Sequence, residues 1–169
     1  MDAVLGRLLV WGLAAGAVTW CLLVVFAPVL PAALAAAVYA AGALVCHQRP
    51  ERSFHWEGAQ LAVCARCTGI YLGGCVTAVL APLPPRLYAR WGTEPQRVRS
   101  LLAAVAAPTA LTVAAEWIGW WTPSAMVRAA TGVVLGVGGG LVVAAALGAL
   151  HYDECLPRAA APRPPQTPT

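Results

Sequence analysis

Long apolar runs constrain this chain more than any other feature. The first run, residues 8–28, has about the 20 residues that an α-helix needs to cross the hydrocarbon core of a bilayer. Across the chain 60% of residues are hydrophobic and 11% are charged, against about a quarter charged in an ordinary soluble domain. Strands with open edges are excluded in lipid, because their backbone polar groups would have no partners there. The runs therefore predict membrane-spanning helices.

Four more apolar runs follow the first one. The second is short and rich in alanine, but tilt and flanking residues can compensate for its length. The four runs are residues 31–46, 61–80, 101–121 and 127–150. We predict an all-α integral membrane protein, a bundle of about five transmembrane helices in one multipass domain.

The domain is expected to cover residues 1–155, with a polar loop rich in Cys, His and Arg at residues 46–71. Residues 156–169 form a proline-rich tail of a composition typical of disorder. The lipid bilayer is therefore the expected surrounding of the domain.

The basic residues are all arginines, and the formal net charge is +4. They form no patch with interleaved aromatic residues, so nucleic acid is not an expected partner, and we interpret them as topology signals. Five crossings would put Arg7, the loop and Arg128 on one face and the termini on opposite faces. The other face would hold Arg86, Arg90, Arg97, Arg99, Arg158 and Arg163. If the loop arginines belong to a site, that second set marks the cytoplasmic face and the cysteine loop is extracytoplasmic.

The loop holds three of the six cysteines. Cys64 and Cys67 have CxxC spacing and are expected in the first turns of the third helix, where residues three apart share a face. Cys46 and His47 close the preceding run, at a distance along the chain that suits zinc sites. These four side chains predict a tetrahedral zinc site, and copper(I) or iron also accepts thiolates.

Two other interpretations of the cysteines stay open. Cys64 and Cys67 could cycle between dithiol and disulfide, with Arg66 favouring a thiolate and Cys46 acting as a third thiol. The cysteines could also simply pack in a helical turn.

The loop arginines have two interpretations. Arg49, Arg52 and Arg66 flank Glu51 and Glu57, so they could make local ion pairs that stabilise little. They could instead bind an anionic ligand, because guanidinium groups match phosphate and carboxylate. Arg66 matters most, since an ionisable group entering a membrane segment is a functional candidate.

Glu116 is the other unusual charge, since it lies near the end of an apolar run beside Trp117. The simpler interpretation is a partly hydrated carboxylate at the membrane interface. The alternative is that Glu116 and Arg128 face inward at the same end as the cysteines. The candidates for catalysis are Arg66, Glu51 and Glu116, and those for substrate binding are Arg49, Arg52, Arg66 and Arg128.

Three glycines of the last run, Gly132, Gly136 and Gly140, recur at four-residue spacing. Small residues on one helix face let helices approach closely. Packing within the bundle is the expected use, with homo-oligomerisation as an alternative.

The segment "CHQRPERSF" followed by "GAQLAVCARCTGIYLG" resembles the signature of small multipass membrane proteins known as domain of unknown function 2085. Arg128, Thr131 and Gly132 are similar to a weaker second part of that pattern. The chain departs from it at Ala62, where members often carry proline, and at Ala125, where they tend to carry asparagine. The resemblance implies a multipass membrane protein and no particular activity.

The function predicted from these residues is metal binding by Cys and His at one membrane face, with an anionic substrate or lipid headgroup held nearby. The first alternative is a membrane thiol–disulfide oxidoreductase that uses the CxxC pair. The second is a non-enzymatic binding or transport protein with a structural metal.

Overall fold

The computed structural model describes residues 3–80 and 94–155, and within these ranges it contains five α-helices. The helices are α1 (Ala3–Phe26), α2 (Ala32–Ala43), α3 (Ala65–Leu80), α5 (Pro95–Trp117) and α6 (Ala125–Cys155). The other elements are two 3₁₀ turns, η1 (Ala27–Val29) and η2 (Pro50–Arg52), and two strands, β1 (Ser53–Trp56) and β2 (Ala59–Cys64). The predicted all-helical membrane architecture is confirmed. The predicted tail, residues 156–169, lies outside the described residues.

In the part of the chain that the structure describes, three segments are long and apolar enough to cross a membrane: Leu8–Val29, Pro95–Trp117 and Ala125–Leu147. The other two helices are apolar but shorter, with 12 residues in α2 and 16 in α3. At about 1.5 Å per residue, α2 is only about 18 Å long, well short of the hydrocarbon core.

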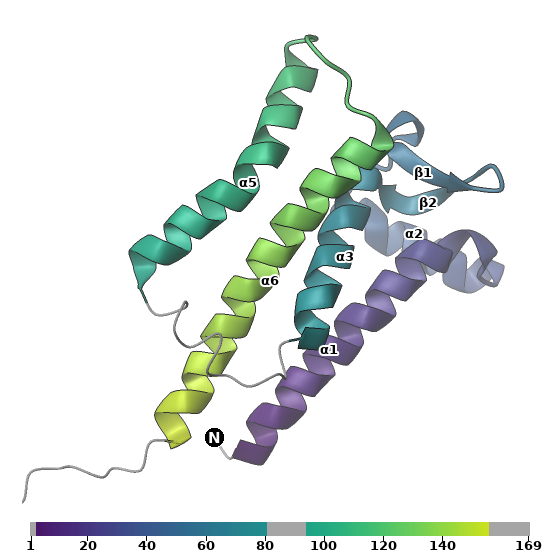
Figure 1. Ribbon diagram of the computed structural model, residues 1–169. Coiled ribbons are helices and arrows are strands. Elements are labelled where there is room, and N and C mark those ends of the chain that lie inside the picture. The colour runs from purple at the N-terminus through teal and green to yellow at the C-terminus, as the bar shows by residue number, and fades with distance from the viewer. Residues whose placement is uncertain (1–2, 81–93, 156–169) are drawn as a thin grey trace, which may run out of the picture.

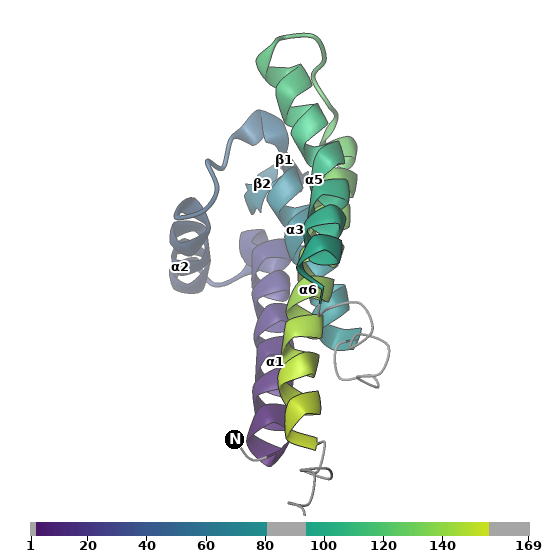
Figure 2. The ribbon, with the colours of Figure 1, turned by 90° about the vertical axis from the view of Figure 1, so that its left-hand side faces the viewer.

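The long helices and α3 run alongside one another, while α2 lies crosswise at the level of the strands (Figures 1 and 2). The start of α1 and the end of α6 lie at the same end of the bundle, away from the strands (Figure 1). This differs from the expectation that the termini lie at opposite faces, because α2 begins and ends near the strands instead of crossing. Arg7, in the first turns of α1, is therefore at the end opposite the cysteines.

The loop contains a β-hairpin that the sequence interpretation missed. β1 and β2 are antiparallel, with His55 opposite Gln60 and Trp56 opposite Ala59. Glu57 and Gly58 form the turn, with φ of 48° and 85°, the positive values that a two-residue type I′ hairpin turn requires. The aromatic residues of β1 and the Gly at the turn were the available signals.

The edge of β2 that does not pair with β1 receives hydrogen bonds from side chains. These bonds satisfy backbone carbonyls that would otherwise lack partners beside apolar helices. Gln48 donates from Nε2 to the carbonyls of Ala62 and Tyr39, at 2.7 Å each. The Tyr39 hydroxyl donates to the carbonyl of Gln60. Gln60 donates in turn from Nε2 to the Gln48 carbonyl at 2.6 Å. These bonds tie the cysteine loop to α2.

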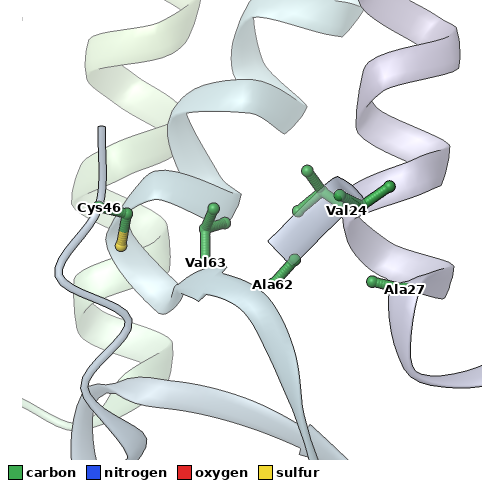
Figure 3. Close-up of a cluster of buried hydrophobic side chains, with 6 residues drawn as sticks. Val24, Ala27, Cys46, Ala62 and Val63 are labelled. Carbon is green, nitrogen blue, oxygen red and sulfur yellow. The ribbon is translucent and has the colours of Figure 1, made fainter. Parts of the chain in front are cut away.

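The apolar side of β2 packs on the end of α1. Ala62 and Val63 are fully buried and lie between Val24 and Ala27 on one side and Cys46 on the other (Figure 3). The hairpin is thereby held against the bundle, and Cys46 becomes part of the core.

Helices α3 and α6 run parallel and touch backbone to backbone. A Cβ built on Gly132 or Gly136 would come within 3.0 Å of the Arg66 or Ile70 carbonyl of α3. Gly69 of α3 is equally close to Ala129. The predicted packing of the α6 glycines within the bundle is thus observed, and Gly140 also lies on α3, against Thr77. Association with a second copy stays a prediction.

We expect Gly136→Val to disrupt this contact, because its side chain would meet backbone that cannot move aside. Overpacking costs about 1–3 kcal/mol, and a clash with backbone should lie at the upper end or beyond. Gly139→Val is the matched control, since nothing lies within 4 Å of a Cβ there. Size-exclusion chromatography and thermal unfolding in detergent provide the measurement. Equal unfolding temperatures for the two variants would contradict the observed packing.

Candidate functional site

Three cysteines from three parts of the chain meet at one point. Cys46 follows α2, Cys64 is the last residue of β2, and Cys67 lies in the first turn of α3. Their sulfur atoms all lie within 4.8 Å of one another. The expectation that Cys64 sits inside a helical turn is wrong, because α3 begins only at Ala65. The CxxC pair instead spans a strand–helix junction.

Hydrogen bonds connect the sulfur atoms of this cluster with nearby backbone amides and with one another. The Sγ of Cys46 accepts hydrogen bonds from the amides of Gln48 at 3.4 Å and Cys64 at 3.2 Å. The Cys67 thiol donates to Cys64, and this bond lowers the pKa of Cys64 despite the opposing effect of burial. Hydrogen bonds to the charged form are what a metal-ligating or nucleophilic sulfur needs.

His47, the fourth predicted metal ligand, is exposed and lies next to Cys46. Among the described residues it is not in the group whose ligand atoms lie within 4.8 Å, but it lines the same pocket. Its role as a ligand stays a prediction.

The cysteines open onto a pocket of about 560 Å³. Its wall includes all three cysteines and His47, together with four arginines. The arginines are Arg49, Arg52, Arg66 and Arg128. The structure thus brings together all the residues predicted to bind substrate and all those predicted to bind metal.

The carboxylate of Glu116 forms ion pairs with three of the four pocket arginines. Its Oε1 lies 2.7 Å from Nη2 of Arg128 and 3.1 Å from Nη2 of Arg52. Its Oε2 lies 3.7 Å from Nη2 of Arg66, which also donates to Thr112 Oγ1 at 3.4 Å. The four charged groups come from η2, α3, α5 and α6. One carboxylate therefore ties four elements together.

The side chain of Glu116 is only 7% exposed. The simpler expectation, a partly hydrated interfacial carboxylate, is wrong, and the inward-facing alternative is correct. Glu116 was misplaced because the neighbouring tryptophans suggested an interface, and Trp117 is indeed 83% exposed. Only the tertiary contacts identify the inward direction of Glu116.

The end of α5 fixes where Glu116 sits. The amide of Trp120 donates to the Ala115 carbonyl at 3.0 Å, and that of Gly119 to the Glu116 carbonyl at 3.3 Å. These two bonds form a Schellman motif, with Gly119 at the left-handed φ of 72° that the motif requires. The helix therefore stops one turn beyond Ala115 and leaves the carboxylate of Glu116 beside Arg52 and Arg128, which line the pocket.

Glu51 lies outside this network. Its carboxylate is 3.9 Å from Nη1 of Arg49, and both side chains are more than half exposed. The local ion-pair interpretation fits Arg49 and Glu51, whereas Arg52 and Arg66 turn to Glu116 instead. A catalytic role for Arg66, Glu51 or Glu116 stays a prediction.

Thr112, Gln48 and Gln60 were not singled out from the sequence as site residues. In the sequence, Gln48 and Gln60 stood out only as members of the signature motif. In the structure, their hydrogen bonds hold the loop that carries Cys46. Thr112 lies one helical turn before Glu116, a spacing that places both on the same face of α5.

Replacing Glu116 by Gln should destabilise the protein strongly. Removing one partner of a buried ion pair costs about 3–5 kcal/mol, because the opposite charges stay buried without compensation. Glu51→Gln is the control, since its exposed pair with Arg49 is worth about 0–1 kcal/mol. Thermal unfolding in detergent distinguishes the two variants. An unchanged midpoint for Glu116→Gln would mean that the carboxylate does not hold the arginines.

Comparison with known proteins gives one family. The family model described as "Predicted membrane protein (DUF2085)" matches residues 46–142, more than half of the chain. An uncharacterized protein of Methanothermobacter thermautotrophicus is 34% identical over 94 residues, which cover 56% of this chain and 79% of that protein. One from Methanocaldococcus jannaschii is 48% identical over 50 residues, 30% of this chain and 32% of that protein. No solved structure matches the chain.

Proposed function

We propose a metal-centre function for this chain, which belongs to the DUF2085 family of predicted membrane proteins. A thiophilic ion such as Zn²⁺ is held by Cys46, Cys64 and Cys67 at one membrane face. The observation that carries the proposal is the convergence of three sulfur atoms within 4.8 Å. With Zn–S bonds of about 2.3 Å, tetrahedral zinc needs sulfurs about 3.8 Å apart, so shifts of roughly 1 Å complete the site.

Three protein ligands are typical of zinc sites that keep one position open, whereas four are typical of structural sites. The fourth position belongs to His47 in a structural centre and to a water or ligand from the pocket in an active one. Copper(I) or iron would accept the same thiolates. The arginines on the pocket wall favour an anionic substrate or headgroup as the molecule that meets the centre.

Detergent-purified protein should contain about one metal ion per chain, because the three thiolates supply a complete soft-ligand face. Cys64→Ser and Cys67→Ser should each reduce the metal content to near zero. Cys75→Ser is the matched control, since Cys75 lies on α3 outside the cluster. Elemental analysis measures the content, and Cd²⁺ substitution adds a thiolate charge-transfer absorption. Full metal content in Cys64→Ser would contradict the proposal.

The second candidate function is thiol–disulfide exchange, which the Cys64–Cys67 hydrogen bond favours. The Cys64 thiolate would attack a substrate disulfide, forming a mixed disulfide and releasing one substrate thiolate. Cys67 would then lose its proton and displace the second, so that Cys64 and Cys67 are oxidised and the substrate is reduced. Metal-free protein whose two thiols appear only after reduction would favour this candidate over the metal centre.

We place the site on the extracytoplasmic face. Arg7, Arg97 and Arg99 lie in helix segments at the opposite end of the bundle, and basic residues mark the cytoplasmic side. Arg86, Arg90, Arg158 and Arg163 lie outside the described residues.

The orientation has a direct test in intact cells. His55→Cys, at the exposed hairpin, should react with a membrane-impermeant maleimide above the wild-type background, because the hairpin faces outward. Gln96→Cys, at the opposite end, should react only after the cells are permeabilised. The reverse pattern would place the site in the cytoplasm.

A further inference from the structure

The arginine pocket carries more positive charge than its own acid can balance. Arg52, Arg66 and Arg128 surround Glu116, so two positive charges remain uncompensated among these four groups. Arg49 at the pocket wall is paired with Glu51 and adds no net charge. The network of Arg52, Arg66, Arg128 and Glu116 therefore carries a net charge of +2 of its own.

Two of these arginines have buried nitrogens without a partner. Among the described residues, Nε of Arg66 and Nε of Arg128 are fully buried and donate no hydrogen bond to any protein atom. Arg128 is only 3% exposed, and both residues line the pocket. A guanidinium has five N–H donors, and the contacts with Glu116 use Nη2 of each arginine. Buried donors without a partner are costly, and the two Nε–H groups show that Glu116 alone does not satisfy these guanidinium groups.

Helix ends add to the same potential. α3 and α6 are parallel, so both N-termini lie at the pocket, with Arg66 and Arg128 in or next to their first turns. The N-terminus of a helix carries a partial positive charge that favours anions. Two helix ends and three guanidinium groups therefore converge on one region.

We propose that this pocket binds the phosphate dianion of a phosphomonoester, with Arg52, Arg66 and Arg128 as donors and Glu116 holding them in position. A dianion matches the excess charge, whereas a carboxylate would leave one positive charge in place. The three terminal oxygens of a phosphate also suit three guanidinium groups that arrive from three elements. The inference deepens the proposed function by naming the ligand class of the same pocket, but the arginine contacts do not require the metal.

The phosphate could belong to a lipid headgroup or to a soluble molecule. Val45 and Trp117 line the pocket and are 66% and 83% exposed, so its wall is continuous with apolar surface. The volume of about 560 Å³ leaves room for more than a phosphate group. Both sources present the same chemistry to the arginines.

The test uses full-length protein and two probes. Glycerol 3-phosphate, titrated into detergent-solubilised protein by calorimetry, represents the soluble source. Nanodiscs containing phosphatidic acid, compared with phosphatidylcholine alone, represent the lipid source through a shift in unfolding temperature. Acetate is the monoanion control. Binding of either phosphate probe, with at least about tenfold weaker binding of acetate, is expected from the charge difference.

Arg52→Gln should weaken phosphate binding about tenfold or more, the usual effect of losing one charge-assisted hydrogen bond. Arg97→Gln is the matched control, because Arg97 is exposed at the opposite end of the molecule and pairs with Glu94. Arg49→Gln provides a second pocket variant, and it should not destabilise the fold because the Arg49 side chain is exposed. Unchanged affinity in both pocket variants, binding of acetate as tight as that of phosphate, or no binding of either probe would overturn the inference.

The same titration on Cys64→Ser separates this inference from the proposed function. Phosphate binding that survives loss of the metal supports the arginine site alone. Metal at full occupancy without phosphate binding supports the metal centre and rejects the phosphate site.

Discussion

The backbone contact between α3 and α6 is the constraint on which the site depends. Because Gly69, Gly132 and Gly136 carry no side chain, the two helix backbones lie in contact and leave no room for a Cβ atom between them. The contact is parallel, so it brings the N-terminal turns of both helices to the same height. Arg66 and Arg128 are adjacent for that reason, and one carboxylate on α5 can reach both. In lipid, where apolar burial does not drive helix association, such close contact is the main available source of specificity.

The hairpin solves a second problem, which is how to place a polar site next to apolar helices. Its apolar residues Ala62 and Val63 join the core with α1, while its open edge is paired by Gln48. The residues of the family signature thus fall into two groups with different structural roles. Gln48 and Gln60 hold the loop, and the cysteines and arginines face the pocket. Each half of the site is therefore built on rigid support, which favours a preorganised ligand site.

The buried charges of the site are unbalanced, with more cations than anions. Glu116 forms ion pairs with three arginines and accepts a hydrogen bond from Arg128, but it does not satisfy all of their N–H groups. A network with more cations than anions is costly in a low-dielectric region unless an anion completes it. The sulfur cluster lies on the same pocket wall, so an ion bound there and an anion bound by the arginines would influence each other through charge.

The sequence by itself determined the membrane class, the helical architecture and the glycine face of α6, because apolar run length and residue chemistry are local properties. The residues that it predicted to bind substrate or metal line one pocket, and their roles stay predictions. The sequence did not determine the hairpin, since the short aromatic run of β1 was outweighed by the rule against open strands in lipid. Only the tertiary structure decided that α2 does not cross the bundle and that Glu116 points inward. Both depend on contacts between segments far apart in the chain, such as Glu116 with Arg52, which no local pattern records.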